Sequence, residues 1–333
     1  MKGHAHERDL LEVENLVVEY AVGGKTVHAV SDVSLAVGRG ETLGLVGESG
    51  CGKSTLGRAV LQLRRPTAGR VVFDGIDLTR LEGEALRLMR PRLQLIFQDP
   101  IASLNPRRRI GDIVAEPLLI TGVADRRERE RRVHQVLTAV GLDPDQTRGR
   151  LPHEFSGGQC QRICIARALI LEPELVICDE PVSALDVSIR AQILNLLEDM
   201  KGRYGLTLLF IAHDLAVVKA VSDRIAVMYL GRLCEVGPTE QLFARPAHPY
   251  TRLLLDAIPV PDPAVRPAAN VPVGEPPSPI TPPSGCRFRT RCPRADALCA
   301  KEMPELRAVG GGQYAACHHP LYESETLINA RCA

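Results

Sequence analysis

The amino-acid sequence predicts an α/β protein whose central sheet is parallel and covered by helices on both faces. Two observations predict this class: short apolar runs alternate with helical patterns through the first three-quarters of the chain, and one run leads directly into a glycine-rich turn. The expected strands span 42–46, 93–97, 175–178 and 207–211. Continuous apolar runs bounded by polar or turn residues are typical of strands buried on both faces. Their alternation with helices favours a parallel sheet.

Composition excludes several classes of protein. The chain has 333 residues, of which 45% are hydrophobic and 24% charged, and this excludes a wholly disordered chain. Its 41 basic and 40 acidic residues leave a net charge of +1, so we expect no nucleic-acid partner. No apolar run approaches the roughly 18–20 residues that span a bilayer, and the start lacks the apolar core of a signal peptide. We therefore expect the chain to stay in the cytoplasm.

Helices are expected between and after the strands. Apolar residues at helical spacing predict a helix over 189–201, and the segment 99–172 is expected to be mostly helical. Clustered arginines within 126–132 are interpreted as a solvated helix face beside an apolar stripe. After about residue 258 the composition shifts to proline and small residues, which indicates a linker before the cysteine-rich end.

The first expected strand leads into a phosphate-binding pattern. Residues Gly47–Ser54 fit G-x-x-x-x-G-K-[ST]. Such a turn lets backbone N–H groups wrap phosphate oxygens, and the following helix adds the positive end of its dipole. Lys53 would reach the β and γ phosphates, and Ser54 would offer its hydroxyl to Mg²⁺. The expected nucleotide contacts in this segment are Gly47, Gly50, Gly52, Lys53, Ser54 and Thr55.

A pair of carboxylates follows the expected strand 175–178. These are Asp179 and Glu180. In a chain with a phosphate loop, Asp179 would hold Mg²⁺ and Glu180 would polarise the water that attacks the γ-phosphate. The two motifs do not distinguish ATP hydrolysis from phosphoryl transfer, because a P-loop kinase would use the same phosphate-binding loop.

The turn Glu154–Gln159 separates these reactions. It is a weak signal alone. Together with the motifs above, Ser156-Gly157-Gly158-Gln159 resembles the signature of ABC-transporter nucleotide-binding subunits and argues against a kinase. The resemblance implies a P-loop NTPase (RecA-like) fold with a helical subdomain, with ATP sandwiched between two such chains. The signature of one chain would face the γ-phosphate held by the other.

The same resemblance implies roles for further residues. Glu180, His213 and Lys53 would carry catalysis, with His213 at the γ-phosphate. The other implied contacts are Tyr20 on adenine, Gln98 sensing Mg²⁺ and the membrane subunits, and Asp186 in the loop that crosses the dimer interface.

Three further segments resemble the ATPases of oligopeptide/dipeptide (and nickel) permeases. They are 98–106, 245–251 and 274–279, and the Gln159 signature is most similar to the second ATPase subunit. The resemblance implies a peripheral ATPase on the cytoplasmic face of the inner membrane. Its partners would be a second ATPase subunit, two membrane subunits and an extracytoplasmic binding protein. The alternative is an ABC ATPase of translation or DNA repair, but those usually carry two cassettes or long coiled coils, and neither is found here.

The predicted domains are an ABC ATPase domain over 10–258, with its helical subdomain at about 99–172, and a proline- and cysteine-rich extension over 259–333. Four of the ten cysteines cluster near the end of the chain, namely Cys286, Cys292, Cys299 and Cys317. A disulfide framework is not expected in a reducing cytosol. The spacing lacks the C-x₂-C pairs of common zinc sites and leaves free thiols, zinc and iron–sulfur open.

The resemblance implies a metal at these cysteines. Peptide-permease ATPases commonly carry this tail, and in some relatives it holds a 4Fe–4S cluster. We therefore expect the four thiolates to ligate such a cluster, with zinc as the alternative and with His318 and His319 as substitute ligands. Cys160 and Cys164 lie one helical turn apart and are interpreted as packing residues rather than a metal pair.

Overall fold

The computed structural model describes residues 9–258 and 275–322, and the chain divides into two compact units. The first unit is formed by residues 38–41 and 80–211. The second unit is formed by residues 9–37, 42–79, 212–258 and 275–322. Most of the predicted proline-rich linker, and Cys332, lie outside the described residues.

The first unit contains parallel strands in the order β8-β7-β6. Their bounds are Leu93–Ile96 (β6), Leu175–Asp179 (β7) and Thr207–Ala212 (β8). Every residue of β7 and β8 is buried, which explains why both appear in the sequence as uninterrupted apolar runs. The three strands predicted for this part of the chain are therefore confirmed.

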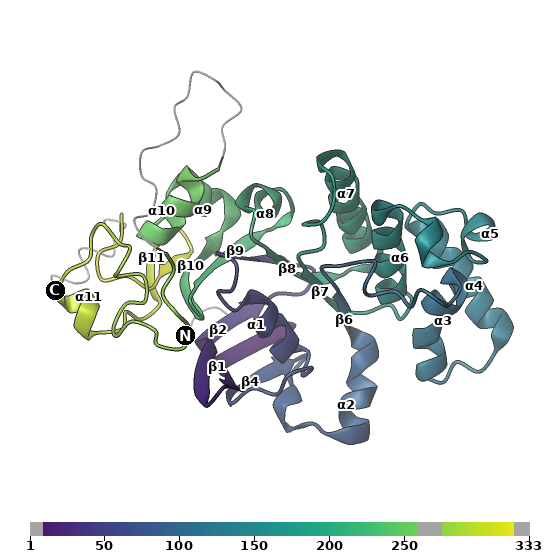
Figure 1. Ribbon diagram of the computed structural model, residues 1–333, viewed down its shortest axis with the longest axis horizontal. Coiled ribbons are helices and arrows are strands. Elements are labelled where there is room, and N and C mark those ends of the chain that lie inside the picture. Colours follow the sequence, from purple (N-terminus) through teal and green to yellow (C-terminus); the bar gives the residue numbers. More distant parts are fainter. Residues whose placement is uncertain (1–8, 259–274, 323–333) are drawn as a thin grey trace, which may run out of the picture. The chain divides into compact units, whose positions relative to one another are not determined.

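Helices make up most of the rest of the first unit. They span Gly83–Met89 (α2), Ile110–Ile120 (α3), Arg126–Ala139 (α4), Pro144–Thr147 (α5), Gly157–Leu169 (α6) and Val187–Tyr204 (α7), with 3₁₀ turns at Arg90–Arg92 and Pro152–Glu154. Helices α3, α4 and α6 pack on one another (teal in Figure 1). The Asp125 side chain caps α4 by accepting from the Arg127 N–H, and Arg126 pairs with Glu130 at the surface. The predicted arginine-rich helix is thus present, with a solvated face.

The second unit contains an antiparallel sheet in the order β2-β1-β4-β5. Its strands span Leu11–Val22 (β1), Lys25–Val37 (β2), Ala68–Phe73 (β4) and Ile76–Asp77 (β5). Buried and less buried residues alternate along much of β1 and β2, as expected for strands with one face in a core. We predicted none of these strands from the sequence.

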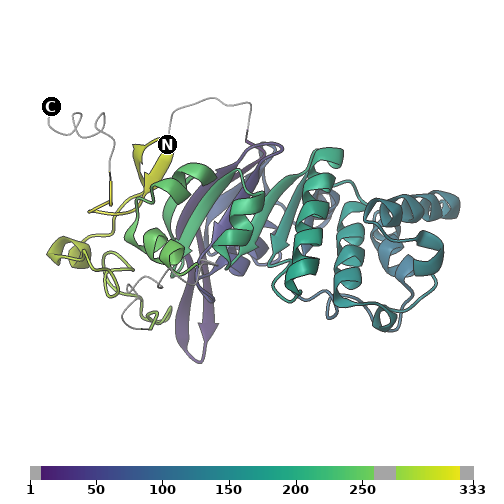
Figure 2. The same ribbon diagram turned by 90° about the horizontal axis from the view of Figure 1, so that it is seen from above.

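A second set of strands in this unit has the order β11-β12-β10-β9-β3. The bounds are Thr42–Val46 (β3), Arg224–Tyr229 (β9), Arg232–Pro238 (β10), Arg307–Gly310 (β11) and Gln313–Ala315 (β12). Strand β3 is parallel to β9, and the remaining pairs are antiparallel. Figure 2 shows the yellow hairpin β11–β12 beside the green strand β10, so the cysteine-rich segment extends this sheet.

The helices of the second unit are short. They span Lys53–Val60 (α1), Leu215–Val221 (α8), Thr239–Ala244 (α9), Pro249–Asp256 (α10) and Ala297–Lys301 (α11), and a 3₁₀ turn occupies Leu78–Arg80. None of the helices that the structure describes, in either unit, has the length and apolar character required to cross a membrane.

Candidate functional site

The predicted phosphate loop connects β3 to α1. The Lys53 ammonium is almost fully buried and donates hydrogen bonds to the carbonyl oxygens of Gly47 (2.7 Å) and Glu48 (3.0 Å). Gly52 has a φ of 107°, and a Cβ there would lie 2.0 Å from the Ala29 carbonyl oxygen. Only glycine fits such a position. The loop therefore closes around its own lysine, ahead of the N-terminus of α1, which is the local structure that the sequence pattern predicts.

Two supports of this loop were missed from the sequence. The Glu48 N–H donates to the Tyr250 hydroxyl (2.9 Å), and the Glu48 carboxylate pairs with the Arg291 guanidinium (2.8 Å). These residues follow Glu48 by 202 and 243 positions, so no local pattern connects them.

Other predicted nucleotide contacts are spread over the second unit. Ser54 and Thr55 are half-buried in the first turn of α1. Tyr20 lies on β1, with the guanidinium carbon of Arg64 4.6 Å from its ring centroid. His213 is exposed in the turn that leads into α8.

The predicted carboxylates lie in the first unit, at the carboxyl end of β7. Asp179 is buried as the last residue of the strand, and Glu180 follows with a φ of 50°. The Glu180 N–H donates to the Ile211 carbonyl oxygen of β8 (2.9 Å), which fixes the turn. Gln98 donates from Nε2 to the Glu180 carboxylate (3.1 Å). The structure thus brings Gln98 and Glu180 together.

The signature turn begins α6 in the same unit. The Ser156 hydroxyl accepts from the Gln159 N–H (3.3 Å), and the Gln159 side chain accepts from the Ser156 N–H (3.0 Å). This capping box leaves Ser156 exposed at a helix N-terminus, with Gly157 and Gly158 in the first turn. A Cβ on Gly158 would lie 2.5 Å from Ile189, which is close in sequence to Asp186, the N-cap of α7. The signature and the Asp186 loop therefore lie close together.

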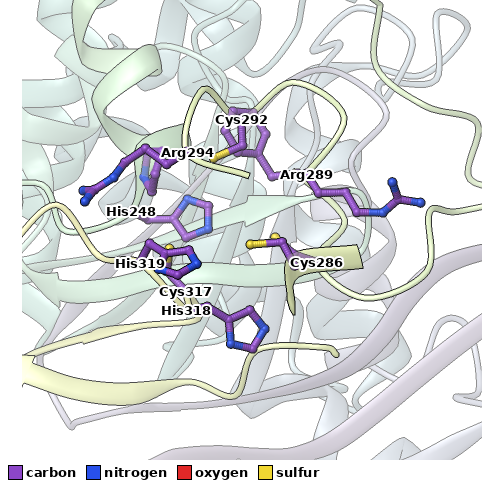
Figure 3. A pocket seen from close by; sticks show the side chains of 11 residues that line it. His248, Cys286, Arg289, Cys292, Arg294, Cys317, His318 and His319 are labelled. Carbon is purple, nitrogen blue, oxygen red and sulfur yellow. The ribbon is translucent and has the colours of Figure 1, made fainter. Parts of the chain in front are cut away.

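The four clustered cysteines line one small cavity in the second unit (Figure 3). Three are buried and Cys292 is half-buried. His248, His318 and His319 lie around the same cavity. His319 Nε2 lies 2.9 Å from Asp296 Oδ2, and His318 Nε2 lies 3.0 Å from the Glu302 carbonyl oxygen. The structure therefore brings together the four sulfurs that the sequence grouped.

Burial raises the pKa of each of these thiols. The pKa of Cys317 is raised to about 12 by burial, with further contributions from the neighbouring cysteines. A metal would be needed to hold the group as thiolates at neutral pH. Among the described residues, the only group of at least three potential ligands whose donor atoms all lie within 4.8 Å of one another is Asp296, Cys299 and His319.

Cys160 and Cys164 are both buried on α6. Their sulfur atoms lie 3.6 Å from two different carbonyl oxygens, those of Pro152 and Pro100. Burial raises the pKa of both thiols. These contacts are those of packing residues, as predicted.

Comparison with known families gives two matches. Residues 30–183 match the ABC transporter family, and residues 234–299 match the oligopeptide/dipeptide transporter C-terminal region. The chain is 54% identical over 311 residues to a peptide import ATP-binding protein of Brucella ovis, which covers 93% of this chain and 98% of that protein. It is 52% identical over 309 residues to the oligopeptide transport ATP-binding protein OppF of Escherichia coli, with 89% and 92% covered.

Solved structures of ABC cassettes are similar in fold. The structure of cbiO1 from Clostridium perfringens, part of the ABC transporter complex cbiONQ, matches with a TM-score of 0.64 at 29% identity and covers 72% of this chain and 92% of that one. The ATP-binding cassette MJ0796, in a dimeric post-hydrolysis state with ADP and Pi, matches with a TM-score of 0.63 at 29% identity, with 69% and 98% covered.

Proposed function

This chain belongs to the ABC transporter ATPase family, and from that membership we propose that it is the ATP-binding and ATP-hydrolysing subunit of an importer for oligopeptides, dipeptides or related small solutes. One observation carries the choice of cargo class. Residues 234–299 match the C-terminal region of oligopeptide/dipeptide transporters, in the same chain whose residues 30–183 match the ABC transporter family. Relatives named for peptide import extend over nearly the whole chain.

The phosphate loop would bind the triphosphate of ATP. The loop glycines and the N-terminus of α1 offer N–H groups, and Lys53 carries the balancing positive charge. Tyr20 would stack on adenine, and Thr55 would complete the set of phosphate contacts. Ser54, Gln98 and Asp179 have the oxygen donors that Mg²⁺ prefers, and bound Mg²⁺ would neutralise charge on the phosphates.

Glu180 would act as the general base. Its carboxylate would orient and polarise a water for in-line attack on the γ-phosphate, and His213 would hold the γ-phosphate in position. The contact between Gln98 and Glu180 supports this arrangement, because the amide restrains the carboxylate directly.

A second ATPase subunit would complete the site. Ser156 is exposed at the start of α6, with Gly157 and Gly158 in the first turn, and this helix N-terminus is suited to bind an anion. It would meet the γ-phosphate held by the partner, across a contact that includes Asp186. We propose a heterodimer with a sister ATPase.

Membrane subunits would dock on the first unit, on the cytoplasmic face of the inner membrane, and an extracytoplasmic binding protein would deliver the solute. Several large apolar side chains there are exposed, including Leu88, Phe97, Ile101, Leu119 and Ile120. The Arg87 guanidinium reaches the Ile120 carbonyl oxygen (3.2 Å), which places the ends of α2 and α3 side by side. The exposed Leu88, Leu119 and Ile120 at these neighbouring helix ends favour a protein partner.

The cysteine cavity would hold a 4Fe–4S cluster, with zinc as the alternative. Four sulfur donors on one cavity suit either metal. A zinc ion with sulfur at about 2.3 Å places its four tetrahedral sulfurs only about 3.8 Å apart. No three of the four sulfurs among the described residues all lie within 4.8 Å of one another, so the sulfurs are not arranged as a closed four-sulfur zinc site.

Anaerobic purification tests the metal. A 4Fe–4S cluster predicts bound iron, acid-labile sulfide and a broad visible absorbance, all lost in Cys317→Ser. Stoichiometric zinc without iron would support the alternative, and a metal-free protein would contradict both.

Glu180→Gln tests the catalytic role. We expect ATP binding to remain and turnover to fall by at least about 100-fold, because the base is lost and the shape is kept. Glu198→Gln on the exposed side of α7 is the matched control. Undiminished turnover in Glu180→Gln would contradict the assignment.

Assembly of the complex tests the cargo. Isolation in mild detergent should recover two membrane subunits and a second ATPase with this chain. Peptides bound by the associated binding protein should then stimulate ATP hydrolysis, whereas stimulation by solutes of another class alone would contradict peptide import.

A further inference from the structure

The segment Cys286–Cys292 contacts the phosphate loop within the second unit. Its Arg291 forms a two-pronged ion pair with Glu48, in which Nη1 lies 2.8 Å from Oε2 and Nη2 lies 2.9 Å from Oε1. The Arg291 side chain is only 5% exposed and that of Glu48 is 26% exposed. Such a fork fixes the orientation of both groups, and a pair shielded from water is costly to break.

Glu48 is also held through its backbone. Its N–H donates to the Tyr250 hydroxyl (2.9 Å). The Tyr250 ring is fully buried, with its centroid 4.7 Å from that of Tyr229 and 5.3 Å from that of Phe288. Phe288 belongs to the segment Cys286–Cys292 and is also buried. The aromatic packing therefore determines where the hydroxyl stands.

The other end of the same segment supports the far side of the phosphate loop. Arg287 donates from Nη2 to the Ser31 hydroxyl (3.0 Å) and from Nη1 to the Leu230 carbonyl oxygen. The next residue, Gly231, donates its N–H to the Cys51 carbonyl oxygen (2.8 Å). Contacts from one C-terminal segment thus reach the phosphate loop directly at Glu48 and through the Leu230–Gly231 turn at Cys51.

Glu48 is the one acidic residue in Gly47–Ser54. Without a counter-charge, its carboxylate would repel a bound triphosphate. We infer that Arg291 and Tyr250 are positioning residues for the nucleotide. They hold Glu48 in place, and the Arg291 guanidinium neutralises the charge of its carboxylate. The C-terminal region therefore supports nucleotide binding at the phosphate loop. This inference rests on the proposed ATP site.

Titration calorimetry with MgATP on the full chain tests the inference. Arg291→Gln should raise the Kd for ATP at least about tenfold, because it leaves a shielded carboxylate without its partner. Adding Glu48→Gln to this variant should recover most of the affinity, which a merely misfolded C-terminal region would not allow. Arg70→Gln is the matched control, because it removes a two-pronged arginine–glutamate pair with Glu14 that lies at the surface of the same unit.

Tyr250→Phe gives a second test that keeps the aromatic packing. Loss of one hydrogen bond to Glu48 should raise the Kd about threefold or more. Unchanged affinity in both Arg291→Gln and Tyr250→Phe, or no recovery in the double variant, would overturn the inference alone. Absence of ATP binding by the unaltered chain would overturn it together with the proposed function.

Discussion

Glu235 should be among the residues on which the C-terminal half depends most. It is fully buried on β10, where Oε1 accepts from the Ala247 N–H (2.8 Å) and Gln313 Nε2 (3.1 Å), and Oε2 accepts from the His248 N–H (2.8 Å). One carboxylate therefore ties the start of α10 and the hairpin strand β12 to β10. Glu235→Ala would leave the buried N–H groups of Ala247 and His248 without this acceptor, whereas Gln313 Nε2 would keep its hydrogen bond to the Arg245 carbonyl oxygen (3.1 Å).

The magnitude follows from these contacts. Each unpaired buried donor costs about 1–3 kcal/mol, so the two backbone N–H groups cost about 2–6 kcal/mol. Part of this cost is offset, because the mutation also removes a carboxylate whose burial as an anion is unfavourable. We expect the free energy of unfolding to fall by about 3 kcal/mol in total. Burial raises the pKa of Glu235. A carboxyl group whose pKa is raised in the folded state stabilises the protein in acid, and this stabilisation is lost as the pH rises through that folded-state pKa. The loss of stability caused by Glu235→Ala should therefore be larger in mildly acidic than in alkaline buffer.

Urea unfolding combined with amide hydrogen exchange measures this effect. The N–H groups of Ala247 and His248 should exchange much faster in Glu235→Ala. Glu235→Gln, which keeps one acceptor oxygen, should lose less stability, and Glu240→Ala at an exposed position of α9 should lose almost none. A loss below about 1 kcal/mol, with unchanged exchange at both amides, would refute the reasoning.

Three further predictions concern glycines and thiols. Gly52→Ala should abolish ATP binding, because the added Cβ would lie 2.0 Å from the Ala29 carbonyl oxygen. Gly50→Ala is the control: Gly50 also has a positive φ, but a Cβ there would have nothing within 4 Å, so measurable ATP binding should remain in calorimetry. Equal ATP affinities of the two variants would contradict this prediction. Gly158→Ala should lower the free energy of unfolding by about 1–3 kcal/mol, because the added Cβ would lie too close to Ile189. Gly157→Ala should leave the stability unchanged, because the nearest atom to its Cβ would be 3.7 Å away. Equal melting temperatures of the two variants would be evidence against this prediction. In metal-free native protein an alkylating reagent should modify the half-buried Cys292 before the buried Cys178, because burial raises the pKa of Cys178 to about 12. Equal labelling rates of the two cysteines, measured by mass spectrometry, would rule this out.

The parallel strands and the motifs at their ends were predictable because their signals are local. The strand predicted over 42–46 is β3, and the glycine-rich turn and lysine follow it within a few residues. Strands buried on both faces need apolar residues at every position, and such runs are visible without knowledge of their neighbours. The contact between Gln98 and Glu180 could be anticipated only through the family resemblance, since they are 82 residues apart.

The antiparallel strands could not be predicted in the same way. Strands β1 and β2 mix polar and apolar residues, so their character depends on which face the sheet buries. Strand β12 has three residues and is defined by its pairing with β10, far earlier in the chain. Arg291 shows the same limit in the functional site: a single arginine between two cysteines has no pattern, and its role follows from what it meets in the folded chain.

The separation of Glu48 and Arg291 has a consequence for the newly made chain. The arginine is added 243 residues after the glutamate. At about 5–20 residues per second, a ribosome needs about 12–50 s to make the intervening chain. For most of this time strand β3 and helix α1 are already made, while the partner of Glu48 does not yet exist. The phosphate loop therefore acquires its final support only near the end of translation, and a chain that terminates early lacks it permanently.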